Sequence, residues 1–183
     1  MVGYISFAVA NALRNWQPLK KVNMLPVFAT DGVNVVVDTP IPAVAIHVSG
    51  DDGYGNTYFG GGIRFYFELQ LHVILPINNY TFSKDGGAQS DLLDSSEEVV
   101  RCVERSELLG TIKQKHDFNI QFDRMDTYQT YATQGANSVA VDIHKVVYKG
   151  SVEFVPNPDE DPDYVELKRV EIDNNGVNTS IIE

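Results

Sequence analysis

Few residues of this chain have the types and spacing that a catalytic or metal-binding site requires. The four histidines stand singly, without the i, i+4 pairing of a zinc-binding helix: His47, His72, His116 and His144. His72 and His144 fall at polar positions of two segments that we expect to be long strands, and Asp142 lies two residues from His144. A metal or acid–base site across strands would need two of His72, His116 and His144 to converge with carboxylates, which their spacing does not demand.

Motifs of nucleotide-binding and hydrolytic enzymes are missing from the sequence. Glycines cluster at residues 53–55 and 60–62, but neither cluster is followed by the Lys-Ser/Thr of a phosphate loop. There is no Gly-x-Ser-x-Gly turn, and Cys102 has no histidine in a nucleophile motif. We therefore predict that the protein is not an enzyme and has no catalytic residue, no cofactor and no bound metal ion.

The composition is that of a globular protein with an acidic surplus. The chain has 183 residues, of which 43% are hydrophobic and 21% charged, and its net charge is −11. Proteins that wrap nucleic acid need a surplus of Lys and Arg, so this charge argues against such a role. The longest apolar stretch, Ile63 to Leu75, is interrupted by charged residues, and residues 1–16 do not resemble a signal peptide. We expect a protein that does not enter a membrane and is made in the cytoplasm.

The acidic surplus is concentrated near the C-terminal end of the sequence. Three prolines between Pro156 and Pro162 exclude a helix there, and the neighbouring carboxylates repel one another. We divide the chain into a domain over residues 1–155 and an acidic linker and arm over residues 156–183. The dipeptide Asn175-Gly176 predicts that this arm ends in a small hairpin. The acidic residues of the arm are Asp159, Glu160, Asp161 and Asp163.

The hydrophobic periodicity predicts an α+β fold. Apolar residues at spacings of three and four indicate one helix over Ile5–Trp16, ended by Pro18, and a second helix from about Ser90 to Glu107. Residues 63–75 alternate between apolar and polar without a break, which predicts an unusually long strand. Shorter β-branched runs predict strands at Val33–Val37 and Ala43–Val48. We expect a mostly antiparallel sheet with both helices packed on one face.

A long hairpin follows the second helix. Alternating residues from Phe118 through Tyr131 and from Val139 to Val147 predict its two strands, joined by a small polar tip at residues 132–138. Its far half should project beyond a core that two helices can cover. Such an overhang is poorly stable alone and is expected where another molecule packs on it. The polar face of the long strand, which includes Arg64 and Glu68, is expected to be solvated or to contact another molecule.

Four segments together resemble the tail terminator and tail completion (head–tail joining) proteins of long-tailed bacteriophages. These segments are the amphipathic start Ile5–Trp16, the long strand Arg64–Val73, the helix Leu92–Arg101 and the strand start Asp117–Phe122. The resemblance implies a structural virion protein of the tail or neck, made in the host cytoplasm. It implies a ring, often a hexamer, that ends growth of the tail tube and joins it to the head connector proteins. DNA would pass through the lumen of the ring without being bound sequence-specifically.

For such a ring subunit we expect particular residues to contact a neighbouring subunit or the tail tube protein. Aromatic and adaptable polar side chains suit such interfaces. In addition to Arg64 and Glu68, the expected contact residues are those around the hairpin tip: Tyr128, Tyr131, Thr133, Gln134 and Asn137.

Three other interpretations remain open from the sequence. The protein could be another ring or adaptor of the neck, or a baseplate component. It could be a non-viral module that binds a small molecule or carbohydrate, with the glycine-rich loop Asp51–Gly62 as the mouth of its pocket. That interpretation predicts a monomer. An enzyme is the third alternative and would require the converging histidines described above.

Overall fold

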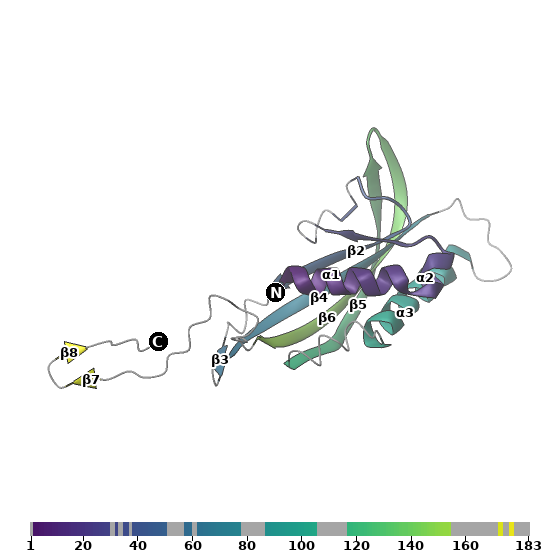
Figure 1. Cartoon of the computed structure of the whole chain (residues 1–183). Coiled ribbons are helices and arrows are strands. Elements are labelled where there is room, and N and C mark those ends of the chain that lie inside the picture. The colour runs from purple at the N-terminus through teal and green to yellow at the C-terminus, as the bar shows by residue number, and fades with distance from the viewer. Residues whose placement is uncertain are drawn as a thin grey trace.

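A computed structural model describes residues 2–29, 32, 35–36, 38–50, 57–59, 62–77, 87–105, 117–154, 172–173 and 176–177. The protein is α+β, as the sequence predicts (Figure 1). The helices and strands are α1 (Val2–Asn15), α2 (Gln17–Lys21), β1 (Leu25–Phe28), β2 (Ala43–Gly50), β3 (Thr57–Phe59), β4 (Gly62–Pro76), α3 (Gly87–Arg105), β5 (Asp117–Gln134), β6 (Asn137–Phe154), β7 (Ile172–Asp173) and β8 (Gly176–Val177).

The main sheet has the strand order β1-β2-β4-β6-β5, and β3 pairs with one end of β4. All its pairings are antiparallel except that of β1 with β2. The long alternating segment is confirmed as the 15-residue strand β4, which pairs with β6 from Ile63 opposite Phe154 to Pro76 opposite Val141. A mostly antiparallel sheet was the expected architecture, and the structure has it.

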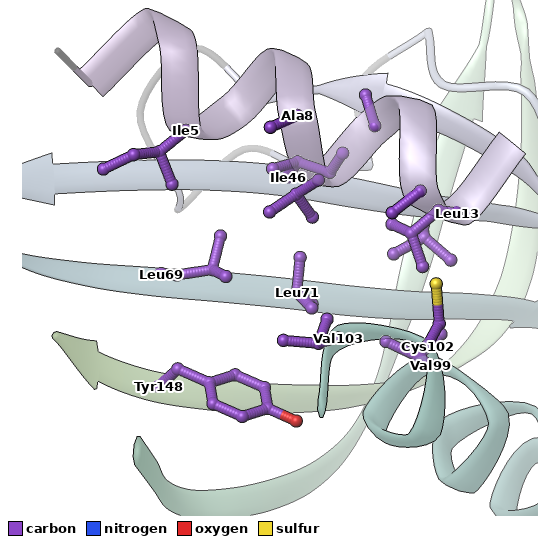
Figure 2. Close-up of a cluster of buried hydrophobic side chains, with 14 of the residues drawn as sticks. Ile5, Ala8, Leu13, Ile46, Leu69, Leu71, Val99, Cys102, Val103 and Tyr148 are labelled. Atoms are coloured by element: carbon purple, nitrogen blue, oxygen red, sulfur yellow. The ribbon is translucent and has the colours of Figure 1, made fainter. Parts of the chain in front are cut away.

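The helices α1 and α3 cover one face of the sheet, and the main core lies beneath them (Figure 1). Figure 2 shows Ile5 and Leu13 of α1 directed toward the sheet, with Val99 and Cys102 of α3 near Leu13. This pattern is the predicted one, because residues three and four apart share one face of a helix. We call this side of the sheet the helix-covered face.

The helix boundaries differ from the prediction in two places. The helix α1 begins at Val2 rather than Ile5 and ends at Asn15, one residue before the predicted end, while Pro18 lies in the first turn of a separate short helix, α2, where its missing N–H costs nothing. The helix α3 begins at Gly87, before the predicted start, so Ser90 lies inside the helix rather than at its cap. The helix α2 was not predicted, because five residues carry no periodic signal.

The prediction of a strand over Val33–Val37 is wrong for the residues that the structure describes there. Val35 and Val36 form a turn, and Val35 is buried against the other face of the sheet. The strand that pairs beside β2 is instead β1, Leu25–Phe28. Val35 is therefore buried by packing rather than as part of a strand, and β1 was not predicted because it contains Pro26.

The second face of the sheet, which we call the helix-free face, carries a smaller apolar cluster at the hairpin end. Its buried members are Val35, Ala45, Ile74, Ala132, Val141 and Ile143. Near the tip, the Thr133 N–H donates to Val36 O at 3.1 Å, and Asp38 N–H donates to Thr133 O at 2.8 Å. The expectation of an unsupported far half is therefore wrong, because the segment before β2 packs on it and bonds to its edge.

The hairpin of β5 and β6 closes with a two-residue turn at Gly135 and Ala136. Gly135 has a φ of +59°, a conformation that glycine adopts without strain. A β-bulge lies between Phe122 and Arg124. The bulge reverses the alternation, so Phe122 lies on the helix-covered face and Tyr128 on the helix-free face.

Beyond β6 the structure describes only the short hairpin of β7 and β8. The hairpin itself was predicted, but Gly176 pairs with Asp173 and belongs to β8. Its turn therefore comes one position earlier than the Asn175-Gly176 signal indicates. The acidic residues Asp159, Glu160, Asp161 and Asp163 lie outside the described residues, so their predicted role stays a prediction.

Candidate functional site

The helix-free face holds a chain of hydrogen bonds across β4 and β5. Gln70 donates from Nε2 to Glu68 Oε1 at 2.6 Å, and Gln70 Oε1 lies 3.3 Å from His72 Nε2. On the other side of the ring, His72 Nδ1 lies 3.3 Å from the Tyr128 hydroxyl. Because an amide oxygen only accepts, the His72 proton resides on Nε2 and Tyr128 donates to Nδ1. The chain therefore fixes the orientation of four side chains and ties β5 to β4 across β6.

His72 is 1% exposed, in contrast to the usual position of a polar strand residue. Burial is the main cause that lowers the pKa of His72 from 6.5 to about 4, with smaller contributions from Lys145 and His47. The ring is neutral at pH 7, and both of its nitrogens are occupied by Gln70 and Tyr128. Within the described part of the chain no group of His, Cys, Asp and Glu is arranged to hold a metal ion.

Charged residues of both signs surround this chain of hydrogen bonds. Lys149 lies opposite Glu68 in the register of β4 and β6, with its Nζ 3.9 Å from Asp123 Oδ2. Arg124 pairs with Asp123 and, at 3.3 Å, with Asp126. Exposed pairs of this kind contribute about 1 kcal/mol or less each. The helix-free face is thus a surface of mixed charge, which does not resemble a phosphate-binding surface.

The residues predicted for an interface divide between two distant surfaces. Arg64 and Glu68 lie on the helix-free face of β4, whereas Thr133 lies near the hairpin tip. Arg64 is level with Glu153 on β6, and Thr133 is level with Ser138. These two positions on β6 are about 15 residues apart, on the order of 50 Å along the strand. The predicted residues therefore do not form one site within a single chain.

The side chains around the hairpin tip are accessible, as expected, but they point in different directions. Tyr131 is 69% exposed on the helix-covered side, and Tyr128 is 38% exposed on the opposite face. Gln134 and Asn137 pair directly beside the turn, and both are exposed. Gln134 also donates to Thr39 O at 3.3 Å. Tyr131 is therefore the more exposed of these two tyrosines.

His144 lies on the helix-covered face, so it cannot share a site with His72. His144 Nδ1 is 2.7 Å from Ser96 Oγ of α3, and both residues are buried. Burial lowers the pKa of His144, while the nearby Asp142 acts in the opposite direction. A catalytic triad needs an accessible serine that contacts one ring nitrogen and a carboxylate on the other. Ser96 is 1% exposed, and we interpret the contact as one that attaches α3 to β6.

We predict that Ser96→Ala lowers the free energy of unfolding by about 1–3 kcal/mol, because it leaves the buried His144 Nδ1 without this partner. The matched control is Ser95→Ala, one position earlier on α3 and also buried, since both changes raise helix propensity equally. Urea unfolding followed by circular dichroism measures both. Equal stabilities of the two variants would show that the Ser96–His144 contact contributes nothing.

Cys102 is part of the main core. The residue is fully buried on α3, and burial with the nearby Glu98 raises the pKa of the Cys102 thiol to about 12. Only the thiolate is a good nucleophile or metal ligand. The side chain therefore acts as a small apolar residue.

A groove of ≈ 320 Å³ runs between α3 and β5 on the helix-covered side. Its apolar part consists of Val100, Phe122 and Met125, and Phe122 and Met125 are also among the exposed apolar side chains. Glu97 and Glu104 form part of its lining, together with Ser96 and Arg101. Sequence reasoning did not find this groove, because the bulge that places Phe122 and Met125 on the same face gives no periodic signal.

Two features that the sequence singled out lie outside the described residues. These are His116 and the glycine-rich loop Asp51–Gly62, apart from the short strand β3 and Gly62. The interpretation of that loop as the mouth of a ligand pocket stays untested.

No protein-family model matches the chain, and no curated protein matches it in sequence. None of the helices in the described residues is long and apolar enough to cross a membrane.

Proposed function

We propose that the protein is a structural subunit of a phage virion that assembles into a ring, a hexamer by its resemblance to tail terminator proteins. The ring would sit at the head-proximal end of the tail tube, stop its polymerisation and join the tail to the head connector. The observation that supports this best is the β5–β6 hairpin, whose outer strand is 18 residues long and exposes aromatic side chains along its length.

The exposed apolar residues favour an assembly protein over a monomer that binds a small ligand. Phe122, Met125, Tyr128 and Tyr131 all lie on β5 and are each at least 38% exposed. As an edge strand β5 carries Asp123, Arg124, Asp126 and a bulge, which oppose the addition of another strand, so we expect association through its exposed side chains. Phe122, Met125 and Tyr131 lie on the helix-covered side of β5, and another molecule that covered them would remove their apolar surface from water.

The buried polar side chains of His72, His144 and Ser96 support a structural role in a second way. His72, His144 and Ser96 satisfy one another or neighbouring side chains, and Cys102 is protonated. A catalytic group must reach its substrate, and these groups are buried. The acidic composition suits a channel through which DNA passes, because attraction to phosphates would retain it.

The experiment that tests the proposal combines mass in solution with tube assembly. We expect the purified protein to form a closed oligomer of several copies and to bind one end of purified tail tubes. Added to polymerising tube protein, it should shorten the tubes in proportion to its concentration, as electron microscopy would measure. A protein that stays monomeric at high concentration and never associates with tube ends would refute the proposal.

We predict that Tyr131→Ser weakens binding to tube ends by about tenfold or more, because an aromatic interface residue commonly contributes more than 1 kcal/mol. The ring of Tyr131 is 69% exposed, so the free energy of unfolding should change by less than about 0.5 kcal/mol. The matched control is Phe7→Ser on α1, which removes another exposed aromatic ring. Equal tube binding by the Tyr131 variant and the wild-type protein would exclude Tyr131 from this contact.

A further inference from the structure

A buried hydroxyl without a partner lies between β6 and α3. Within the residues that the structure describes, the Tyr148 hydroxyl is the buried side-chain group that forms no hydrogen bond, and Tyr148 is 1% exposed. Folding removes such a hydroxyl from water without replacing its hydrogen bonds, which is unfavourable and uncommon in proteins. A group of another molecule that bonded to this hydroxyl would recover the loss.

This hydroxyl lies behind the wall of the α3–β5 groove. The ring of Tyr148 extends from β6 toward α3, with its oxygen at the end nearer α3 (Figure 2). Its cross-strand neighbour on β5 is Phe122, which lines the groove, and the two rings meet edge to face with centroids 5.8 Å apart. Burial raises the pKa of Tyr148, and the charge of Glu104, another lining residue, raises it further. The hydroxyl is therefore next to Phe122 and within reach of the Glu104 charge.

The groove also carries one negative charge that nothing balances. The basic residue that the structure places in the lining is Arg101, which pairs with Glu97 at 3.6 Å and with Glu98 at 2.7 Å. Glu98 accepts a further hydrogen bond from Trp16, at the junction of α1 and α2. Glu104, in contrast, is exposed and forms no ion pair with any residue of the described chain. A positive group in the groove would compensate this carboxylate.

The apolar part of the groove suits an alkyl chain. It consists of Val100, Phe122 and Met125, and the volume of ≈ 320 Å³ is at the lower end of what ligand pockets enclose. A long basic side chain commonly lies with its methylene groups on apolar surface while its charged end reaches polar groups. Phe122 and Met125 belong to the row on β5 through which we expect association. The groove is thus continuous with a surface on which a partner protein would lie.

We propose that the α3–β5 groove binds one lysine side chain of a partner protein. The methylene groups would lie on Val100 and Met125, and the ammonium would lie between the Glu104 carboxylate and the Tyr148 hydroxyl. The ammonium has three N–H groups, of which one donates to the hydroxyl oxygen and the others to the carboxylate. Phe122 is 43% exposed, so its ring can turn outward and open the way to the hydroxyl. A planar guanidinium would have to displace more of this ring, which favours lysine over arginine.

The proposal rests on the proposed function only for the identity of the partner, so its first test uses the protein alone. Blocked lysine (N-acetyl-lysine methylamide) is titrated into the full chain, and the methyl NMR signals of the methionines are followed. Met125 lines the groove, whereas Met24 is buried in the main core and serves as the internal control. We expect the Met125 signal to shift and saturate with a dissociation constant on the order of millimolar, and the Met24 signal to stay in place. Blocked norleucine, which has the same four-carbon stem without the ammonium, should bind about tenfold more weakly.

Two variants test the groups that hold the ammonium. Glu104→Gln should weaken the binding of blocked lysine by about fivefold or more, because it removes the charge that attracts it. The matched control is Asp94→Asn, which makes the same change in charge at an exposed position of α3 outside the groove and should bind like the wild-type protein. Tyr148→Phe should weaken binding by about threefold or more. It should not lower the urea midpoint of unfolding, since the hydroxyl that it removes has no partner in the free protein.

A Met125 signal that does not move, or blocked norleucine that binds as well as blocked lysine, would overturn the proposal. The same holds if Glu104→Gln or Tyr148→Phe binds blocked lysine as the wild-type protein does, or if Tyr148→Phe unfolds at lower urea. Tail tubes separate the proposal from the proposed function. If Glu104→Gln bound tube ends as strongly as the wild-type protein, the groove would not hold a lysine of the tube, and the partner contact would be wrong. A wild-type protein that bound blocked lysine but never tube ends would refute the proposed function and leave the lysine site in place.

Discussion

Replacing Gly150 by alanine is expected to lower the free energy of unfolding by about 2–3 kcal/mol, although only one methyl group is added. Gly150 lies in β6, opposite Phe67 in β4 and Ile120 in β5. A Cβ atom there would lie 2.6 Å from the Asn119 carbonyl oxygen and would also overlap the ring of Phe67. The backbone of Gly150 does not have a positive φ, so the expected loss comes from this overlap and not from backbone strain.

The surroundings of Gly150 cannot give way easily. Phe67 is 2% exposed, and its ring stacks on Phe118 with the centroids 5.8 Å apart. The second obstacle is backbone of β5, which the β5–β6 ladder holds in register. Moving the ring would open the core beneath the helices, and moving Asn119 would strain the ladder. Alanine stabilises a protein by a few tenths of a kcal/mol because it restricts the conformations of the unfolded chain, and either response would cost more free energy than that.

Gly50→Ala provides the matched control, because Gly50 pairs with the other side of the same Phe67. A Cβ atom at Gly50 would meet nothing within 4 Å. We expect Gly50→Ala to leave stability unchanged or to raise it by up to about 1 kcal/mol. Thermal and urea unfolding of the two variants measures the difference. If both variants were as stable as the wild-type protein, the close approach of Phe67 to Gly150 would not be a feature of the folded protein.

The fold was largely predictable because its main elements are long and strictly periodic. The alternation of residues 63–75 predicts β4, and the spacing of three and four predicts most of α1 and α3. The misses have local causes. Val35 is β-branched, but it is buried by packing on the sheet and not as part of a strand. The strand β1 contains Pro26, and proline argues against a strand unless that strand is known to lie at the edge of a sheet.

The candidate sites were less predictable, because they depend on which face each side chain takes. Alternation places His72 on the polar side of β4, but it cannot show that Tyr128 and Gln70 bury it. His144 appears equivalent in the sequence, yet the pairing of β6 with β5 and β4 directs it toward Ser96 on the other face. The groove depends on a bulge and on the approach of α3 to β5, and neither leaves a pattern in the sequence.

Acid should destabilise the protein through His72 before most carboxylates are protonated. In the folded protein burial holds the pKa of His72 at about 4, below its ordinary value of 6.5. Between these two values the unfolded chain binds a proton that the folded chain does not, so lowering the pH favours unfolding. The stabilisation is complete above about pH 6.5 and is lost progressively down to about pH 4. Between about pH 7 and pH 4.5 this loss should be about 2 kcal/mol.

The variant His72→Gln isolates this contribution, because glutamine keeps a polar side chain and does not titrate. We expect it to be less stable than the wild-type protein at about pH 7, where its hydrogen bonds are poorer, by about 1–2 kcal/mol. Toward about pH 4.5 the difference should shrink and then reverse, since only the wild-type protein must exclude a proton from a buried ring. Urea unfolding at a series of pH values measures both curves, and carboxylates shared by the two proteins cancel in the difference.

Tyr128→Phe separates the effect of burial from that of the hydrogen bond. The variant removes the hydroxyl that lies 3.3 Å from His72 Nδ1 but leaves the ring of residue 128 in place. Losing this hydrogen bond should lower the free energy of unfolding by about 1 kcal/mol at pH 7. Because burial is the largest cause of the lowered pKa of His72, the variant should keep most of the pH dependence of its stability. If His72→Gln kept the wild-type pH dependence, or if Tyr128→Phe abolished it, the buried neutral imidazole would not be the group that couples stability to pH.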